Sequence, residues 1–154
     1  MKISEIRRKI DYCIDRFYEN DIDLLNRDNY EVTITAKFAS YLASQFSSYT
    51  VDCEYNKHLA SKKDAIVNGI PRLVRPDIVI HSRGTNQRNL VCIEIKTDHN
   101  GDNRDEDVHK LIGMTKNSLD KKYAYNYTLG VFLDFYRDKS RLVKRFFING
   151  KEVT

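Results

Sequence analysis

Long apolar runs are absent from this 154-residue sequence, and cysteine is sparse. No stretch approaches the roughly 20 apolar residues that a helix needs to cross a bilayer, and the charged N-terminus lacks the apolar segment of a signal peptide. The three cysteines are odd in number and widely spaced, without a Cys-x-x-Cys pair. This pattern argues against a disulfide framework and a thiolate metal site. We therefore expect a cytoplasmic protein without a membrane segment, in which Cys13, Cys53 and Cys92 stay reduced.

Internal repeats, low-complexity segments and domain linkers are also absent. The length predicts one domain over residues 1–154 with a core of its own. Hydrophobic residues make up 41% of the sequence and charged residues 31%, which is typical of a soluble domain. The formal net charge is +4 and the isoelectric point is about 8.9. This mild excess of positive charge is compatible with a polyanionic partner such as nucleic acid, and equally with ordinary surface charge.

Two helices are predicted in the first third of the chain. Apolar residues recur at helical spacing over 3–18, which predicts an amphipathic helix packed on a core. A second helix is predicted over about 30–47, and its wide apolar stripe indicates burial on more than one side. Glu31 stands in the first turn of this second helix. It either complements the helix dipole or points toward the acidic residues described below.

Strands dominate the rest of the chain. Alternation and short apolar runs predict strands over 50–55, 77–80, 90–96, 127–135 and 142–148. A helix is predicted from 102 or 104 to 121. A long basic loop is predicted over 56–74 and carries Lys62, Lys63 and Arg72, whose charge suits phosphate contact and is equally compatible with a solvated loop. The element order predicts an α/β domain with a mixed central sheet flanked by helices.

Three charged residues interrupt the two central strands. Asp77 opens one strand, and Glu94 and Lys96 lie near the end of the next. Side chains alternate faces along a strand, so Glu94 and Lys96 point the same way, with Ile93 and Ile95 opposite. If the strands pair, Asp77 reaches the same patch. Charges on a largely apolar sheet are costly unless a cation or polar ligand satisfies them.

Such a patch suits a hard divalent cation. Mg²⁺ takes oxygen ligands and often needs only one or two carboxylates, with water and substrate phosphate completing its shell. The backbone carbonyl of Ile95 could supply another oxygen. A metal there activates water, and Lys96 is placed to hold the phosphate or neutralise developing negative charge. The alternative is that Glu94 and Lys96 form a surface ion pair of little energetic weight.

Pro76-Asp77, followed by Glu94-Ile95-Lys96, resembles the signature of the PD-(D/E)XK nuclease superfamily. The spacing between the two motifs and the order of predicted elements fit that superfamily from about residue 30 to 135. The chain is similar to its small stand-alone, mostly uncharacterised bacterial members. The resemblance implies a restriction-endonuclease-like αβββαβ core within residues 30–148, preceded by an N-terminal helical extension over 1–29.

The resemblance also implies a function. Asp77, Glu94 and the Ile95 carbonyl would bind Mg²⁺ or Mn²⁺, and Lys96 would assist the attacking water. Glu31 would match the acidic residue of the first core helix, with Glu54 as its rival. Contacts with nucleic acid, expected to be DNA, would involve the basic loop together with Arg75 and Lys110.

The expected activity is hydrolysis of phosphodiester bonds. The alternative is a catalytically silent module of the same fold that binds nucleic acid or a partner protein. Small nucleases of this shape often dimerise to cut both strands, so a homodimer is also an expectation.

Overall fold

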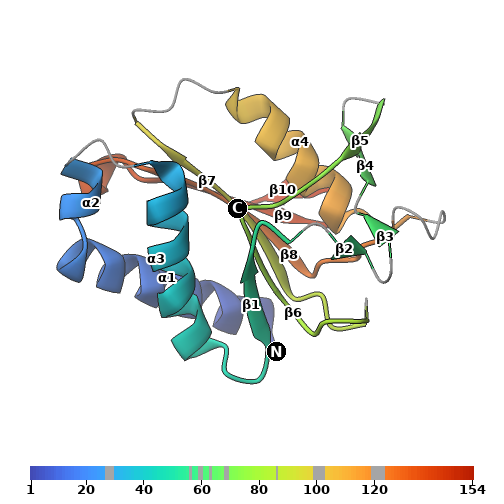
Figure 1. Ribbon diagram of the computed structural model, residues 1–154, viewed down its shortest axis with the longest axis horizontal. Helices are drawn as coiled ribbons and strands as arrows, with labels where there is room; N and C mark the ends of the chain where they lie inside the picture. The colour runs from blue at the N-terminus through green and yellow to red at the C-terminus, as the bar shows by residue number, and fades with distance from the viewer. Residues whose placement is uncertain are drawn as a thin grey trace.

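A six-stranded mixed sheet forms the centre of the protein (Figure 1). The computed structural model describes residues 1–26, 30–55, 57–58, 61–62, 64–67, 70–85, 87–98, 103–118 and 124–154. The strand order is β1-β6-β7-β8-β9-β10, in which only β7 and β8 run parallel. The strands are β1 (Thr50–Cys53), β6 (Ile78–His81), β7 (Val91–Thr97), β8 (Leu129–Phe135), β9 (Val143–Ile148) and β10 (Lys151–Val153). The predicted α/β class with a mixed sheet is confirmed.

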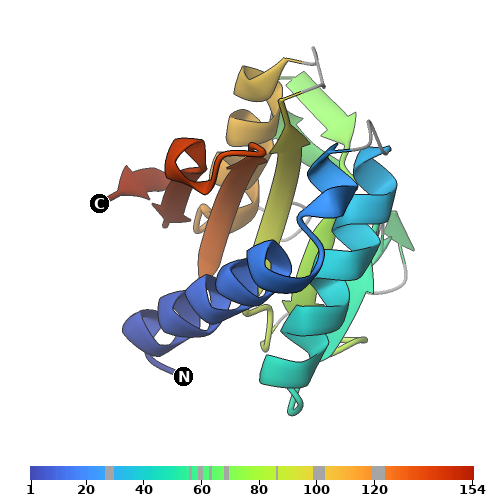
Figure 2. The same ribbon diagram turned by 90° about the vertical axis from the view of Figure 1, so that its left-hand side faces the viewer.

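Helices cover both faces of this sheet. Helices α1 (Ile3–Asn20), α2 (Asp23–Asn26) and α3 (Glu31–Gln45) lie on one face, as Figure 2 shows. Helix α4 (Arg104–Thr115) lies on the other face against β7 and β8, beside the hairpin of β4 (Asp64–Val67) and β5 (Ile70–Leu73). None of the helices in the described ranges is long and apolar enough to cross a membrane.

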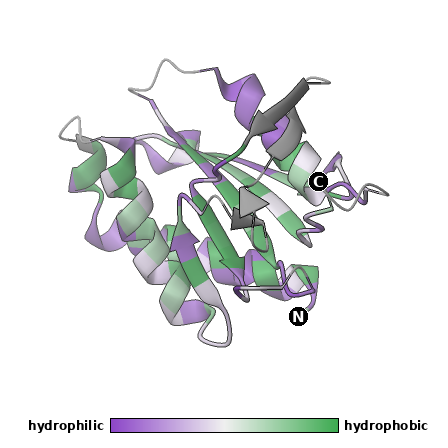
Figure 3. Ribbon diagram, turned by 45° about the vertical axis from the view of Figure 1, so that its right-hand side comes forward, coloured by the Kyte–Doolittle hydropathy of each residue, from purple (hydrophilic) through white to green (hydrophobic). Residues whose placement is uncertain are grey.

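The two-residue period of β7 assigns its side chains to two separate cores. Ile93 and Ile95 join the core under α1 and α3, and Cys92 joins the core under α4. Figure 3 shows the hydrophobic central strands and the hydrophilic first turns of α4. All seven residues of β7 are buried, so Glu94 and Lys96 are charges enclosed between sheet and helix, as their alternation with isoleucines predicts.

Aromatic side chains fill the core under α1 and α3. Phe38 of α3 is fully buried, and its ring centroid lies 6.3 Å from that of Phe17 and 5.5 Å from that of Phe135. These edge-to-face contacts join both helices to β8, and such pairs contribute about 0.5–1.5 kcal/mol beyond their buried area. The N-terminal helix therefore shares the main core.

The prediction of a loop over 56–74 is wrong, because the structure forms short strands within this range. The structure contains β2 (Lys57–His58) paired with β3 (Ser61–Lys62), and β4 paired with β5. These strands have two to four residues each, too short for an alternating pattern to emerge.

Two further element boundaries differ from prediction. Helix α4 ends at Thr115 rather than at 121, because Lys116 adopts extended backbone with ψ 132°. Asn149 and Gly150 have φ of 52° and 74°, the conformation of a tight hairpin turn. The chain therefore reverses after β9 and adds β10 instead of ending its last strand there. The short helix α2 lies within the predicted helical extension over 1–29.

Candidate active site

The site lies where strand β6 stops and β7 continues. Strand β6 pairs with β7 only from Ile78–Ile80 to Val91–Ile93, whereas β7 pairs with β8 through Thr97. Asp77 immediately precedes β6, and its Oδ2 accepts a hydrogen bond of 2.6 Å from the Ile95 N–H. The Asp77 side chain thus occupies the edge of β7 that β6 leaves open, next to Glu94 and Lys96.

Glu94 is the most deeply enclosed carboxylate of the site, with 1% of its surface exposed. Lys110 of α4 places its Nζ 3.4 Å from Glu94 Oε2. Oε1 is buried and has no hydrogen-bond partner among the described residues. A buried oxygen without a partner is unfavourable. Asp107 Oδ2 also lacks a hydrogen bond among the described residues but has Lys96 Nζ at 3.1 Å, whereas Glu94 Oε1 has no ion pair and so most needs a ligand. This burial excludes the alternative of a surface ion pair.

Lys96 joins the two helical layers around the end of the sheet. It is 7% exposed, and its Nζ lies 3.3 Å from Glu31 Oε1 and 3.1 Å from Asp107 Oδ2. Glu31 is the first residue of α3 and Asp107 belongs to α4. The structure therefore brings Glu31 into contact with the site, as one of the two sequence interpretations expects.

Glu54, the rival to Glu31, lies to one side. It follows β1 with a positive φ of 48°, and its exposed carboxylate is 3.7 Å from the guanidinium of Arg75. Together with Glu31 and Asp77 it lines a small cleft of about 170 Å³. This volume accommodates an ion and a few waters, since one water takes about 30 Å³ of liquid. The cleft gives Asp77 an opening to solvent.

Asp107 is a site residue that the sequence did not suggest. It is 4% exposed, and its Oδ1 lies 2.6 Å from Lys110 Nζ. The helical spacing of position 107 nevertheless indicates that it is buried. Leu111 and Met114 are fully buried, and residues four and seven positions apart share a helix face. A carboxylate at position 107 of such a stripe is a buried charge.

A second ion pair stands beside the cluster. Asp134 of β8 opposes Lys96 in the parallel register and is 2% exposed. Arg104, the first residue of α4, places its Nε 2.6 Å from Asp134 Oδ2 and also donates to the Thr97 carbonyl. Asp134 is thus paired with Arg104, while Lys96 pairs with Glu31 and Asp107.

Burial shifts the protonation of both central carboxyls. It raises the pKa of Asp77 to about 6, and the charges of Glu31 and Asp107 add to the rise, against the Ile95 N–H and Lys96. Burial likewise raises the pKa of Glu94 well above its usual range, with the Asp77 charge adding to it. The fold thus disfavours the charged form of both carboxyls, and a nearby cation would favour it again.

The pKa values of the two lysines of the site are also raised, which for a lysine favours the charged form. Burial lowers the pKa of Lys96, but the charges of Asp107 and Glu31 outweigh it, so the pKa is raised. Burial also lowers the pKa of Lys110, but the Glu94 and Asp107 carboxylates outweigh this effect, so the pKa is raised. Both side chains are therefore cations at neutral pH, suited to holding negative charge rather than to removing a proton.

Asp77 and Glu94 are the side chains that fit a divalent cation. Both present oxygen, the donor that Mg²⁺ prefers, and the unpartnered Glu94 Oε1 has an unmet need for a positive ligand. In the described part of the chain, no three or more His, Cys, Asp and Glu side chains form a metal-binding group. A cation would therefore need backbone, water or phosphate oxygens as well, as Mg²⁺ sites commonly do.

Of the residues predicted to contact nucleic acid, Arg75 and Lys110 have side-chain contacts in the described structure. Arg75 is exposed and faces Glu54, and Lys110 contacts the acidic cluster. Lys62 belongs to β3 and Arg72 to β5. Lys63 lies outside the described residues.

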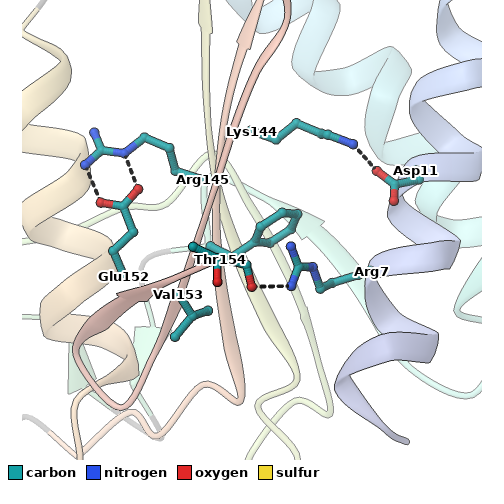
Figure 4. A pocket seen from close by; sticks show the side chains of 8 residues that line it. Arg7, Asp11, Lys144, Arg145, Glu152, Val153 and Thr154 are labelled. Carbon is teal, nitrogen blue, oxygen red and sulfur yellow. Dashed lines mark hydrogen bonds and ion pairs between the residues drawn. The ribbon is translucent and has the colours of Figure 1, made fainter.

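A larger hollow lies elsewhere, between α1 and the last two strands (Figure 4). Its charges are already paired: Lys144 Nζ lies 2.6 Å from Asp11 Oδ1, and Arg145 donates two hydrogen bonds of 2.8 Å to Glu152. Arg7 donates to the Thr154 carbonyl. This hollow contains none of the residues of the Asp77–Glu94 cluster.

Comparison with protein-family models, with curated proteins and with solved structures finds no match for this chain.

Proposed function

We propose that this protein is a divalent-metal-dependent nuclease of the PD-(D/E)XK type that hydrolyses phosphodiester bonds of nucleic acid, with DNA as the expected substrate. The observation that carries the proposal is the buried, unpartnered Oε1 of Glu94 beside Asp77, whose own pKa is raised to about 6. A fold that holds two carboxyls in this condition gains most from a bound cation.

The order of elements around the site supports the same proposal. Helix α3 brings Glu31, strands β1, β6 and β7 follow, α4 covers the site and β8 pairs with β7. This succession fits a restriction-endonuclease-like αβββαβ core, with α1 as the N-terminal addition. The short β2–β5 hairpins are inserted between the first and second core strands.

Asp77, Glu94 and the main chain of Ile95 would hold the cation. The Ile95 N–H points to the open edge of β7, where it donates to Asp77, and the carbonyl of an extended residue projects to the same edge as its amide. Bound Mg²⁺ would lower the pKa of water and stabilise charge on a phosphoryl group. The two carboxylates would orient the ion, and α4, which packs on β7, would limit its exposure to bulk solvent.

Lys96 contributes positive charge to the reaction. Its ammonium, held by Glu31 and Asp107, is placed to hold a phosphate oxygen and to stabilise the negative charge that develops in in-line attack. Lys110 adds a second ammonium on the α4 side of Glu94. Both groups act through charge and hydrogen bonds, because Asp107 and the neighbouring carboxylates keep them protonated.

Cleavage assays test the proposal. Purified protein is incubated with plasmid and linear DNA in Mg²⁺ or Mn²⁺, beside Asp77→Asn, Lys96→Met and the control Asp105→Asn, an exposed residue of α4. The wild type and the control should cut, and the two site variants should lose at least about 100-fold in rate. Cutting that survives both site substitutions, or the absence of any cutting by the wild type, would sink the proposal.

A catalytically silent module is the second candidate. Both lysines are already paired with carboxylates, so the cluster partly compensates its own charge without a metal. Titration calorimetry separates the two candidates. Mn²⁺ binding that Glu94→Gln abolishes supports the nuclease, and a wild type that binds nucleic acid but no divalent cation supports the module.

A further inference from the structure

Asp107 holds two ammonium groups at once. Its Oδ1 lies 2.6 Å from Lys110 Nζ and its Oδ2 lies 3.1 Å from Lys96 Nζ. Lys110 comes from the same helix, whereas Lys96 comes from β7. A single enclosed carboxylate thus links the helix to the strand that carries the motif residues.

Stability does not account for this arrangement. Position 107 shares a helix face with Leu111 and Met114, both fully buried. An apolar residue would serve the core there, since replacing buried ion pairs with packed hydrophobic groups is often neutral or stabilising. An exposed i,i+3 pair with Lys110 would contribute only about 0.3–0.5 kcal/mol. Two buried charges, Asp107 and Lys96, and the half-buried Lys110 are better explained by what Asp107 holds in place.

Each lysine that Asp107 holds also touches a second acidic group of the site. Lys96 reaches Glu31 at 3.3 Å, and Lys110 reaches Glu94 Oε2 at 3.4 Å. Contact with Lys110 engages Oε2 and leaves Oε1 unpartnered among the residues described. The orientation of Glu94, and so the oxygen it offers, therefore depends on where Asp107 keeps Lys110.

We propose that Asp107 is a positioning residue, which sets the place of the Lys96 ammonium and, through Lys110, the orientation of Glu94. This inference rests on the proposed nuclease function and adds a residue to it. Outer carboxylates of this kind hold the ligands and charged groups that touch the reacting atoms.

Asp107 also contributes to the net charge of the site. Asp77, Glu94, Glu31 and Asp107 are four carboxylates, against the two ammonium groups of Lys96 and Lys110, a formal excess of two negative charges. One divalent cation neutralises this excess. Asp107→Asn halves it, whereas Asp107→Glu preserves it and moves the carboxylate by one methylene.

These two substitutions separate charge from position. Asp107→Asn should bind Mn²⁺ about 10–100-fold more weakly, the usual effect of losing an outer partner of a metal ligand. Asp107→Glu should keep Mn²⁺ affinity within about threefold but lose about 10–100-fold in kcat with little change in KM, because small displacements of a catalytic group carry large rate penalties. Asp105→Asn, an exposed change on the same helix, should match the wild type in both measurements.

The experiment combines Mn²⁺ calorimetry on EDTA-treated protein with steady-state cleavage of a DNA duplex. Circular dichroism confirms that each variant is folded, and Asp107→Glu carries the test if Asp107→Asn is not. A folded Asp107→Glu protein with the kcat of Asp105→Asn overturns the positioning role while leaving the proposed function intact. A wild type that neither binds Mn²⁺ nor cuts DNA overturns both.

Discussion

Removing the charge of Asp77 is expected to stabilise the metal-free protein at neutral pH. Burial, with the charges of Glu31 and Asp107, raises the pKa of this carboxyl from 3.8 to about 6. One pKa unit corresponds to about 1.4 kcal/mol, so keeping Asp77 ionised in the folded protein costs about 3 kcal/mol. Asparagine retains an oxygen that can accept the hydrogen bond from Ile95 but does not ionise. Asp77→Asn therefore removes the penalty and keeps the bond.

Proton linkage gives the sign of the pH dependence. The folded protein holds the Asp77 proton more tightly than the unfolded chain does. The stability linked to this proton is complete below about pH 4 and is lost as the pH rises through about 6. The Asp77→Asn protein has no ionisable group at this position, so it does not lose this stability as the pH rises. Its advantage in free energy of unfolding should be small at about pH 4 and reach about 3 kcal/mol at about pH 8.

Urea denaturation in EDTA, at several pH values across this window, measures the difference. The control Asp105→Asn should stay within about 0.5 kcal/mol of the wild type throughout. A difference between wild type and Asp77→Asn that does not change with pH would refute the idea that the fold disfavours this anion. Mn²⁺ should reverse the order, because a ligand stabilises the folded protein that binds it.

Three further predictions concern packing and pairing, each measured by urea denaturation at neutral pH. Phe38→Ala should lower the free energy of unfolding by about 3–5 kcal/mol, because the ring is fully buried among aromatic side chains. Gly130→Ala should cost about 1–3 kcal/mol, since an added Cβ would lie 3.0 Å from Thr115 Cγ2 and push α4 off β8. Arg104→Met should cost about 1–3 kcal/mol by removing the ion pair of buried Asp134 and leaving it, among the described residues, only the 3.4 Å hydrogen bond from the Tyr136 hydroxyl, and the double variant with Asp134→Asn should recover most of the loss.

Controls for these variants come from the surface. Val32 is 59% exposed on the same helix as Phe38, so Val32→Ala should change little. Arg16 pairs with Glu19 in solvent, and Arg16→Met should cost less than about 1 kcal/mol. A Gly130→Ala protein as stable as the wild type would contradict the close approach of α4. Additive effects in the Arg104 and Asp134 cycle would contradict their pairing.

Local patterns predicted the parts of the site that local geometry fixes. Glu94 and Lys96 share a face because strand side chains alternate, whatever the rest of the fold does. Asp77 lies beside them because it immediately precedes β6, which pairs with β7. The sequence allows two interpretations of Glu31, since a first-turn carboxylate satisfies a helix dipole as readily as a distant lysine.

The remainder depended on contacts between segments distant in sequence. Asp107 ends a run of three acidic residues that begins at Asp105, so its helical spacing to Leu111 is a weak signal, and its burial follows from the packing of α4 on β7. The hairpins between 57 and 73 contain strands held by pairing rather than by residue pattern. The turn at Asn149–Gly150 carried a readable signal, but whether a further strand followed depended on the free edge of β9.

The register of β7 against β8 has a consequence for tolerated changes in chain length. Glu94 opposes Phe132, with both strands buried along their whole length. One residue inserted or deleted within β7 ahead of Glu94 would turn its carboxylate into the aromatic core and bring an isoleucine to the site. The connection between β6 and β7 lies outside the paired residues and is free of that constraint. Across related chains, insertions and deletions should therefore gather in this connection and be excluded between Cys92 and Thr97.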